Sequence, residues 1–555
     1  MCIIVTASCW PTITSPRDSA PLLGLEPSKN DLWRGAGGAR SDFRPGTGIT
    51  GWRFHIESSR TREAPNSPGS LSTLSTEEDQ DGQPIHQVSA RPWTAITTSD
   101  EAVSHLVSLF LAWMNPTWRF VEQDIFLRGM RSKQLDSDFC SSFLVNSICA
   151  IASVRRDVTF HGSWRRMLTQ HKLQSEHEVA FSGEGRDRIT RGRHFHDEAL
   201  RLWALEEYRP SLTNIQALCI LSLKSNYRAK DRLGLTLIPI AVQLNNELPL
   251  NEYQRRYVDN DFYRRDFAVA RLSTHWTAKC THIIMRLAFM SPATVTANVS
   301  GLPKIREVYD DRSEPWIGYP FTTDAVAYRP TMYLVERCRL AELFQEMHDL
   351  IFTQRRMSIR EFATALDQLS SRVQQWYQHL PFELHYEWPM SIYIWELHAS
   401  YLTSLMILWC AAKTKFEQRQ ETSDYPQSST GTTGGDDHDD AHFRSQMAQK
   451  RLSSSILLAH KAAEMLRDFR ERYGLKVTPA WLLQLQAVTA GVLLQDPELA
   501  DPTIISSPEV NASDRSIRNS HAAFDEVFRC LLGTGVEVMI ARGIARMMYH
   551  TALDR

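Results

Sequence analysis

The sequence lacks several features that would place it in a well-defined class of protein. It has no excess charge of either sign, because 62 Lys and Arg residues nearly balance 64 Asp and Glu residues, for a net charge of −2. This excludes binding to nucleic acid or an anionic membrane through a general excess of basic residues. The longest apolar run, residues 402–412, is about half of the ~20 residues that a membrane-spanning helix needs. We therefore expect a soluble, intracellular protein that does not enter a membrane.

Close pairs of cysteines are also missing. The chain has nine cysteines, at positions 2, 9, 140, 149, 219, 280, 338, 410 and 530. Their odd number, their wide spacing and the apolar runs around most of them predict reduced, buried thiols. The first ten residues have no basic segment and contain Thr6 and Ser8, so they do not resemble a secretory signal.

Linear catalytic motifs are absent as well. The sequence has no Gly-x-Ser-x-Gly elbow, no His-Glu-x-x-His pair and no Gly-x-x-x-x-Gly-Lys phosphate loop. A Ser/His/Asp set that assembles only in space would escape such a search. We predict that the chain is not an enzyme, and we assign no catalytic, cofactor-binding or metal-ligating residue and no cofactor.

Two stretches have the composition of disordered chain. Residues 1–91 are dense in Pro, Gly, Ser, Thr and scattered charges, and residues 417–440 run through Ser, Thr and Gly into Asp436-Asp437-His438-Asp439-Asp440. Such segments bury too little apolar surface to offset the entropy lost on ordering. We predict a disordered N-terminal tail over 1–91, and an acidic, low-complexity loop over 417–440 within a folded domain over 92–555.

The remainder shows helical periodicity, with apolar residues three and four apart. A capping box from Thr98 to Glu101 predicts the start of the first helix, which Pro116 should end. Pro239 should kink or end the helix expected over 233–244. Alternating runs typical of a sheet are missing, so we predict an all-α fold. The further helices expected from this period are 139–154, 195–208, 212–223, 268–289, 332–352, 362–380, 392–412, 452–473 and 522–549.

Some segments have the residue types and spacing of a functional motif but not the secondary structure that the motif requires. Residues 46–51 fit the Gly-x-Gly-x-x-Gly fingerprint, yet no buried strand precedes them. The run Asp436 to Asp440 resembles the magnesium-binding aspartates of helical terpene cyclases, but we predict it in a loop rather than on a helix. His194 and His196 are two residues apart and should point to different sides of a helix, with Asp197 and Glu198 in its first turn.

Two arginine-rich stretches have the composition of a nucleic-acid-binding or nuclear-import surface. Residues 252–271 interleave five Arg with aromatic residues, but four acidic residues reduce the net charge to one, which favours an ion-paired helix face. Residues 186–193 carry four Arg against Asp187, so both a nuclear-import patch and a solvated loop stay open. Five tryptophans on helical stripes are interpreted as core: Trp113, Trp203, Trp276, Trp376 and Trp395.

Several blocks occur in an order that resembles a known family. The most specific is Pro210-Ser211-Leu212-Thr213-Asn214-Ile215-Gln216-Ala217-Leu218, after residues 195–203. The others are Pro92-Trp93-Thr94, residues 105–113, 120–126, 139–150 and 231–234 with Ala241 and Leu250, Thr274-His275-Trp276, Trp376 to Pro381, and Leu397-His398-Ala399-Ser400-Tyr401. Together they resemble the regulatory, middle-homology domain of fungal zinc-cluster transcription factors. The resemblance covers most of residues 93–411 and weakly the remainder.

The sequence also departs from this family. Phe289 to Pro292 stands where the family usually has a Gly-Arg-Pro turn, Leu408-Trp409-Cys410 replaces Arg-Pro-Phe, and Pro239 replaces a small residue. The largest departure is the zinc cluster, whose six thiolates come from arms that begin Cys-x2-Cys. Cys2 and Cys9 alone cannot complete such a cluster. Zinc is therefore expected only if an N-terminal cluster is missing from this sequence.

The resemblance implies a nuclear transcription regulator without autonomous DNA binding in this chain. Its implied partners are a DNA-bound transcription factor or the transcription machinery, together with a small-molecule effector held between helices. Two alternatives stay open. One is a terpene-cyclase-like helical enzyme acting on an apolar substrate, and the other is a helical interaction scaffold.

Overall fold

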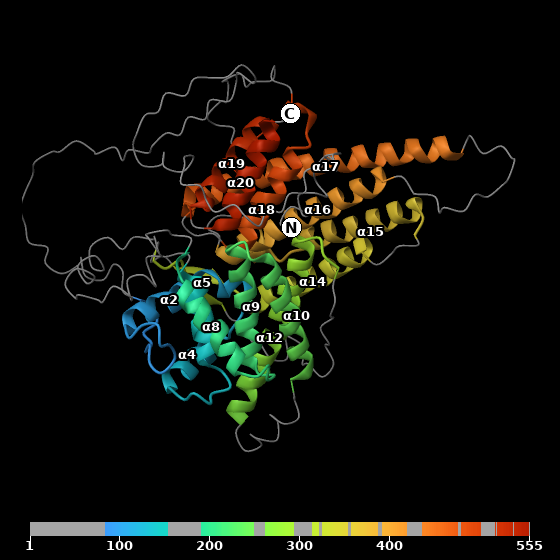
Figure 1. Cartoon of the computed structure of the whole chain (residues 1–555). Coiled ribbons are helices and arrows are strands. Elements are labelled where there is room, and N and C mark those ends of the chain that lie inside the picture. Colours follow the sequence, from blue (N-terminus) through green and yellow to red (C-terminus); the bar gives the residue numbers. More distant parts are fainter. Residues whose placement is uncertain are drawn as a thin grey trace, which may run out of the picture.

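The computed structural model describes residues 84–153, 190–248, 261–292, 313–320, 325–352, 357–386, 391–418, 436–475, 479–500, 517, 519–536 and 538–553. These residues form fifteen α-helices and a two-stranded hairpin (Figure 1). The predicted all-α fold is confirmed. We describe helices α2 to α12 as the N-terminal group and α14 to α20 as the C-terminal group.

The folded part begins before the predicted boundary at residue 91. Val88 and Ala90 are buried, and the backbone N–H groups of His86 and Val88 donate to Ser108 Oγ (3.0 Å) and Ser104 Oγ (2.9 Å). Residues 84–91 thus pack along helix α2, Asp100–Trp113. The rest of the predicted tail, residues 1–83, lies outside the described residues.

The start of α2 differs by one residue from the prediction. Ser99, not Thr98, is the N-cap, and its side chain accepts from the Ala102 N–H. At the other end α2 stops at Trp113, and Pro116 lies in the first turn of α3, Asn115–Trp118. Proline is tolerated there because the first N–H groups of a helix have no intrahelical partner.

The remaining N-terminal helices build the lower part of Figure 1. They are α4 Gln123–Ser132, α5 Ser142–Ala152, α8 Arg193–Leu205, α9 Leu212–Tyr227, α10 Asp231–Glu247 and α12 Asp261–Ala288. Helix α9 lies at the centre, in contact with α5, α10 and α12, and nearly all its side chains are buried. Ser211 caps it by accepting from the Asn214 N–H. Helix α10 runs on through Pro239, so this proline does not end it.

A short antiparallel hairpin connects the two groups. Strands β1 Glu314–Ile317 and β2 Ala325–Tyr328 pair with Trp316 opposite Val326. The Trp316 indole donates to the Ala112 carbonyl oxygen at 2.6 Å, which docks the hairpin on the end of α2. Sequence analysis did not predict this hairpin, since four-residue strands are too short to show an alternating pattern.

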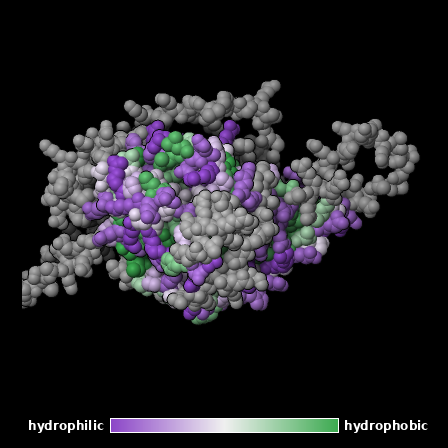
Figure 2. All heavy atoms as spheres, turned by 90° about the horizontal axis from the view of Figure 1, so that it is seen from below, coloured by the Kyte–Doolittle hydropathy of each residue, from purple (hydrophilic) through white to green (hydrophobic). Residues whose placement is uncertain are grey.

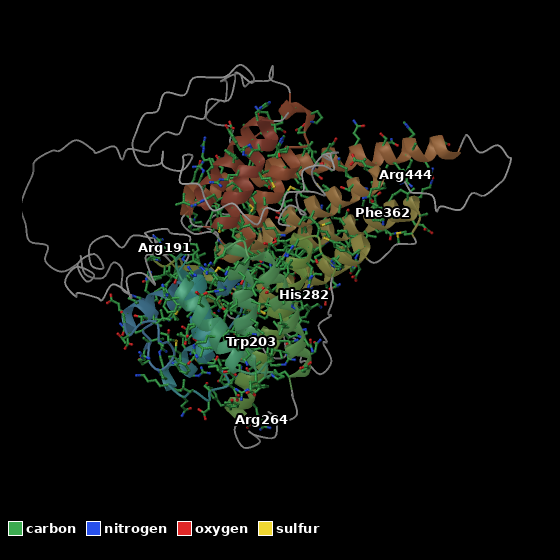
Figure 3. The ribbon with its side chains drawn as sticks, viewed as in Figure 1. Arg191, Trp203, Arg264, His282, Phe362 and Arg444 are labelled. Carbon is green, nitrogen blue, oxygen red and sulfur yellow. The ribbon has the colours of Figure 1, made fainter. Side chains whose placement is uncertain are left out.

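The C-terminal group consists of α14 Pro330–Phe352, α15 Ile359–Gln378, α16 Ile392–Glu417, α17 Asp436–Tyr473, α18 Ala480–Leu493, α19 Ser520–Gly535 and α20 Met539–Leu553. Helices α16 and α17 lie side by side, and α15 joins them in the arm that extends to the right of Figure 1. In Figure 3, Phe362 and Arg444 mark this arm, whereas Arg264 marks the lower tip of α12. The single helix predicted over 522–549 is two helices, α19 and α20.

The two groups share one apolar core. It runs from Val88 and Trp93 to Met548 and includes buried side chains of almost every helix. The face seen in Figure 2 mixes hydrophilic and hydrophobic residues over the described surface. The predicted core tryptophans Trp113, Trp203 and Trp395 are buried, while Trp276 and Trp376 are partly exposed.

Candidate functional site

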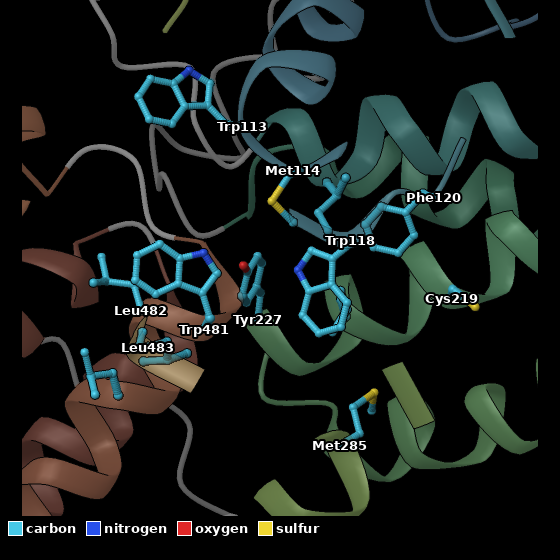
Figure 4. Packing of buried hydrophobic residues seen from close by; sticks show 14 of the residues in the cluster. Trp113, Met114, Trp118, Phe120, Cys219, Tyr227, Met285, Trp481, Leu482 and Leu483 are labelled. Carbon is cyan, nitrogen blue, oxygen red and sulfur yellow. The ribbon is translucent and has the colours of Figure 1, made fainter. Parts of the chain in front are cut away.

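A pocket of about 110 Å³ lies where the two helix groups meet. Trp118 of α3, Leu223 and Tyr227 of α9 and Met285 of α12 line it from the N-terminal group. The C-terminal group contributes Glu396 and Ser400 of α16, Trp481, Leu483, Gln484, Ala487 and Val488 of α18, and Ile540 and Ile544 of α20. We call this space the central pocket. Figure 4 shows Tyr227 between the indoles of Trp118 and Trp481.

The lining of the central pocket is mainly apolar. Aliphatic and aromatic side chains supply most of it, and its polar members are Asn226, Tyr227, Glu396, Ser400 and Gln484, besides the two indoles. A concave, largely apolar site with a few polar groups is the usual form of a small-molecule site. The pocket is therefore the candidate functional site.

Two indole N–H groups at the pocket have no hydrogen-bond acceptor among the described residues. Trp118 and Trp481 are 5% and 4% exposed, and the Nε1 atom of each is buried without a partner. Two other buried indoles show the usual pairing: Trp93 Nε1 donates to the Met130 carbonyl oxygen at 2.9 Å, and Trp113 Nε1 to that of Tyr319 at 2.5 Å. Because buried donors are normally satisfied, the two free N–H groups are unusual.

A polar cluster around Glu396 forms part of the pocket wall beside Trp118. Arg337 and Glu396 form an ion pair, and both side chains are at most 5% exposed. The Tyr333 hydroxyl lies 2.6 Å from Glu396 Oε2, and Ser400 Oγ donates to Glu396 Oε1 at 2.8 Å. The Arg337 guanidinium also lies over the Trp118 ring, 5.1 Å from its centroid. We call these residues the Glu396 cluster; its opposite charges compensate each other.

A second buried basic side chain, Lys224, has no carboxylate partner among the residues that the structure describes. Lys224 of α9 is 1% exposed, and its Nζ donates to the Arg191 carbonyl oxygen at 3.2 Å. Burial, with a smaller effect of Arg228, lowers the pKa of Lys224 to about 7. His196 of α8 is also buried, and burial lowers its pKa to about 4. At neutral pH the fold therefore holds His196 in its neutral form, and Lys224 is protonated far less than an exposed lysine.

The histidine motif at residues 194–198 lies at the start of α8. The helix begins at Arg193, so the predicted helix is confirmed. Asp197 and Glu198 come after its first turn, where neither is among the first-turn acidic residues. Asp197 instead contacts Arg193 and the His196 ring at 3.4 and 3.3 Å.

The acidic run Asp436–Asp440 was predicted in a loop, and this was wrong. Helix α17 begins at Asp436, where acidic residues are favoured because they oppose the positive end of the helix dipole. Asp440 pairs with Arg360 of α15 at 2.9 Å, toward the end of the arm rather than at the central pocket. Residues 419–435 of the predicted loop lie outside the described residues.

The other motifs fall largely outside the described residues. This holds for residues 46–51, for 186–189 and for 252–260, as well as for Cys2 and Cys9. The seven cysteines that the structure describes are buried and form no disulfide, as predicted. In the described ranges no three His, Cys, Asp or Glu side chains converge as a metal site, so these residues do not fit a zinc cluster. None of the described helices is long and apolar enough to cross a membrane.

Sequence reasoning missed the residues of the central pocket. Trp118 follows Pro116 in a four-residue helix, and Trp481 opens α18, a helix that sequence analysis did not predict. Neither lies on a recognised motif. An N–H group without an acceptor becomes visible only when the positions of all its neighbours are known.

Comparison with known proteins points to fungal transcription regulators. The chain is 32% identical over 149 residues to the notoamide biosynthesis transcriptional activator notL' of Aspergillus versicolor. It is 26% identical over 321 residues to the nitrogen assimilation transcription factor nit-4 of Neurospora crassa. It is 23% identical over 333 residues to the nitrogen assimilation transcription factor nirA of Emericella nidulans.

These similarities cover parts of each protein. They span 27%, 56% and 56% of this chain, and 20%, 26% and 33% of notL', nit-4 and nirA respectively. This chain thus matches at most a third of the length of each relative. No family profile and no solved structure matches the chain.

Proposed function

We propose that this chain contains the regulatory domain of a fungal transcription regulator of the zinc-cluster class. The observation that carries the proposal is the similarity to nit-4 and nirA, which extends over 56% of the chain in each case. An alignment of that length spans many helices, so it supports a shared domain rather than one shared motif. The blocks around Ser211 and Leu397 begin or lie within buried helices, as expected of residues that define a fold.

We assign this domain to residues 84–553, since their buried side chains form one continuous core. The proposed role places the protein in the nucleus, where the domain acts on a DNA-bound transcription factor or on the transcription machinery. Direct contact with DNA is not part of the proposal for this chain. Its charge is balanced, and the described cysteines do not form a thiolate cluster.

A tethering experiment tests the proposal. The full chain is fused to a bacterial DNA-binding domain, and transcription of a reporter carrying that domain's site is measured in a fungal host. We expect the fusion to raise or lower transcription relative to the DNA-binding domain alone. Trp113→Ala, which removes a fully buried side chain, should abolish the effect, whereas exposed Glu346→Gln should retain it. A well-expressed nuclear fusion that leaves transcription unchanged would contradict the proposal.

Autonomous DNA binding is tested separately on the purified full chain. We expect no retained zinc and no shift of a specific duplex, because six thiolates in two arms are needed for the cluster. Retained zinc together with a specific shift would overturn this part. For the terpene-cyclase alternative, the position of Asp440 beside Arg360, away from the pocket, is unfavourable. Magnesium-dependent turnover of a prenyl diphosphate would revive it.

A further inference from the structure

We infer that the central pocket binds a neutral, apolar molecule about the size of a single ring that carries a hydrogen-bond acceptor oxygen. The two indoles that line the pocket, Trp118 and Trp481, would donate to that oxygen or oxygens. Three observations define this ligand: the volume of the pocket, the compensation of charge at its wall and the free indole N–H groups.

The volume sets the size of the ligand. The pocket measures about 110 Å³, somewhat less than the ~150 Å³ cavity of apolar lining that takes up benzene in an engineered protein. A molecule with one five- or six-membered ring therefore matches the space without rearrangement. Larger, drug-like molecules usually occupy pockets of ~300 Å³ or more.

The wall of the pocket favours a neutral ligand. Glu396 is the one carboxylate among its lining residues, and it is already paired with Arg337 and contacted by Tyr333 and Ser400. A charged ligand would lose its hydration without finding a free counter-ion, which is strongly unfavourable in a buried site. The aliphatic side chains of Leu223, Val488 and Ile544 favour an apolar body.

The two indoles determine which polar group the ligand must carry. An indole offers an N–H donor and no acceptor, so its missing partner must supply an oxygen or another acceptor. In the described part of the chain, Trp118 and Trp481 are buried indoles whose Nε1 atoms have no hydrogen-bond partner, and both line this pocket. In Figure 4 both indole nitrogens are turned toward Tyr227, the residue between them. A ketone, an ether or an ester would satisfy an N–H group there.

The ligand would also join the two helix groups. Trp118 belongs to α3 of the N-terminal group, and Trp481 to α18 of the C-terminal group. A molecule held between them contacts both, so its binding should stabilise the arrangement of one group against the other.

Cyclohexanone is a suitable probe, and methylenecyclohexane is its control, because the two differ by a carbonyl oxygen against a CH₂ group. The purified full chain is titrated with each, and the rise in the thermal unfolding midpoint with ligand concentration gives the affinity. We expect saturable binding of cyclohexanone, about five-fold weaker binding of methylenecyclohexane from the missing hydrogen bond, and no binding of cyclohexanecarboxylate.

Variants locate the binding. Trp118→Phe and Trp481→Phe keep an aromatic ring but remove the donor, and at least one should lower the preference for cyclohexanone to about equality. Ala487→Leu should fill the pocket and abolish binding. Ala365→Leu, at a half-buried alanine of α15 outside the pocket, should retain it.

Absence of saturable cyclohexanone binding would overturn the inference, as would binding that Ala487→Leu leaves unchanged. A preference for cyclohexanone that both Phe variants preserve would overturn the role of the indoles. These measurements use purified protein without DNA or a reporter. Their failure is therefore distinct from failure of the proposed role in transcription, and the binding inference does not depend on that role.

Discussion

The Glu396 cluster and the central pocket both include contacts with Trp118. They differ in whether their polar groups have partners within the protein. In the cluster the opposite charges of Arg337 and Glu396 form an ion pair, and Glu396 also accepts from Tyr333 and Ser400. In the pocket the N–H groups of Trp118 and Trp481 make no hydrogen bond within the part of the chain that the structure describes. A buried donor without an acceptor costs about 1–3 kcal/mol. The charges of the cluster therefore compensate each other within the protein, whereas the two indole N–H groups of the pocket make no hydrogen bond to any described residue.

The largest effect should come from opening the Glu396 cluster. Glu396→Ala removes the partner of Arg337 and leaves a buried charge uncompensated, so we expect a loss of about 3–5 kcal/mol in the free energy of unfolding. Glu346→Ala, which removes the exposed partner of Arg372, should cost no more than about 1 kcal/mol. Denaturant unfolding of both variants measures the difference, and equal losses would show that the cluster is not the compensated site described here.

Lys224 offers a second contrast with the Glu396 cluster, because this buried lysine has no carboxylate partner among the described residues. Its pKa is lowered to about 7, so between that pH and its ordinary pKa near 10.5 the unfolded chain binds more protons than the folded chain. Stability should therefore rise as pH increases from about 7 to about 10, by an amount on the order of a few kcal/mol.

Lys224→Met should flatten this pH dependence, while Lys230→Met, at the exposed residue before α10, should leave it intact. Thermal unfolding midpoints over the pH range measure the effect. A slope that is unchanged in Lys224→Met would show that the lysine is not held neutral by the fold.

Two matched substitutions compare an indole N–H group that makes a hydrogen bond with one that makes none. Trp113→Phe leaves the Tyr319 carbonyl oxygen without its partner, whereas Trp118→Phe removes a donor that has no acceptor. Both lose similar ring volume. We expect Trp113→Phe to be more destabilising by about 1–2 kcal/mol. Similar losses in denaturant unfolding would mean that the Trp118 N–H group is satisfied in solution.

The smallest effect concerns the volume of the pocket. Ala487→Leu places additional carbon atoms in the unfilled space and should stabilise the free protein by about 1 kcal/mol, as filled cavities commonly do. Ala365→Leu should give no such gain. Destabilisation by Ala487→Leu in calorimetry would show that the pocket is too small or too rigid to be filled.

The helices could be predicted because they depend on local pattern. Helices α5, α9, α12, α14, α15 and α16 follow apolar residues three and four apart, and their cores overlap the predicted ranges. Their ends were less accurate, since capping depends on one side chain, as the shift from Thr98 to Ser99 shows. Three helices, α3, α4 and α18, were missed, and the break between α19 and α20 was not visible in a continuous apolar pattern.

The candidate site could not be predicted for a different reason. It brings together residues from α3, α9, α12, α16, α18 and α20, which are far apart in the sequence. Whether an indole has an acceptor depends on the positions of neighbours from all of these helices. The residues next to Trp118 and Trp481 in the sequence do not indicate that the two indoles lack an acceptor. The Asp436–Asp440 run is the opposite case. Its sequence resembles a metal-binding motif, but the pairing of Asp440 with Arg360 does not support a metal site there.

The decisive measurement is the NMR spectrum of the indole N–H groups in full-length protein labelled with ¹⁵N-tryptophan. Trp118→Phe and Trp481→Phe assign the two signals. On addition of cyclohexanone at least one of these signals should move to the position of a hydrogen-bonded indole, while methylenecyclohexane should not produce that change. Signals that stay in place with cyclohexanone, or that move equally with both molecules, would contradict an acceptor-binding site at the central pocket.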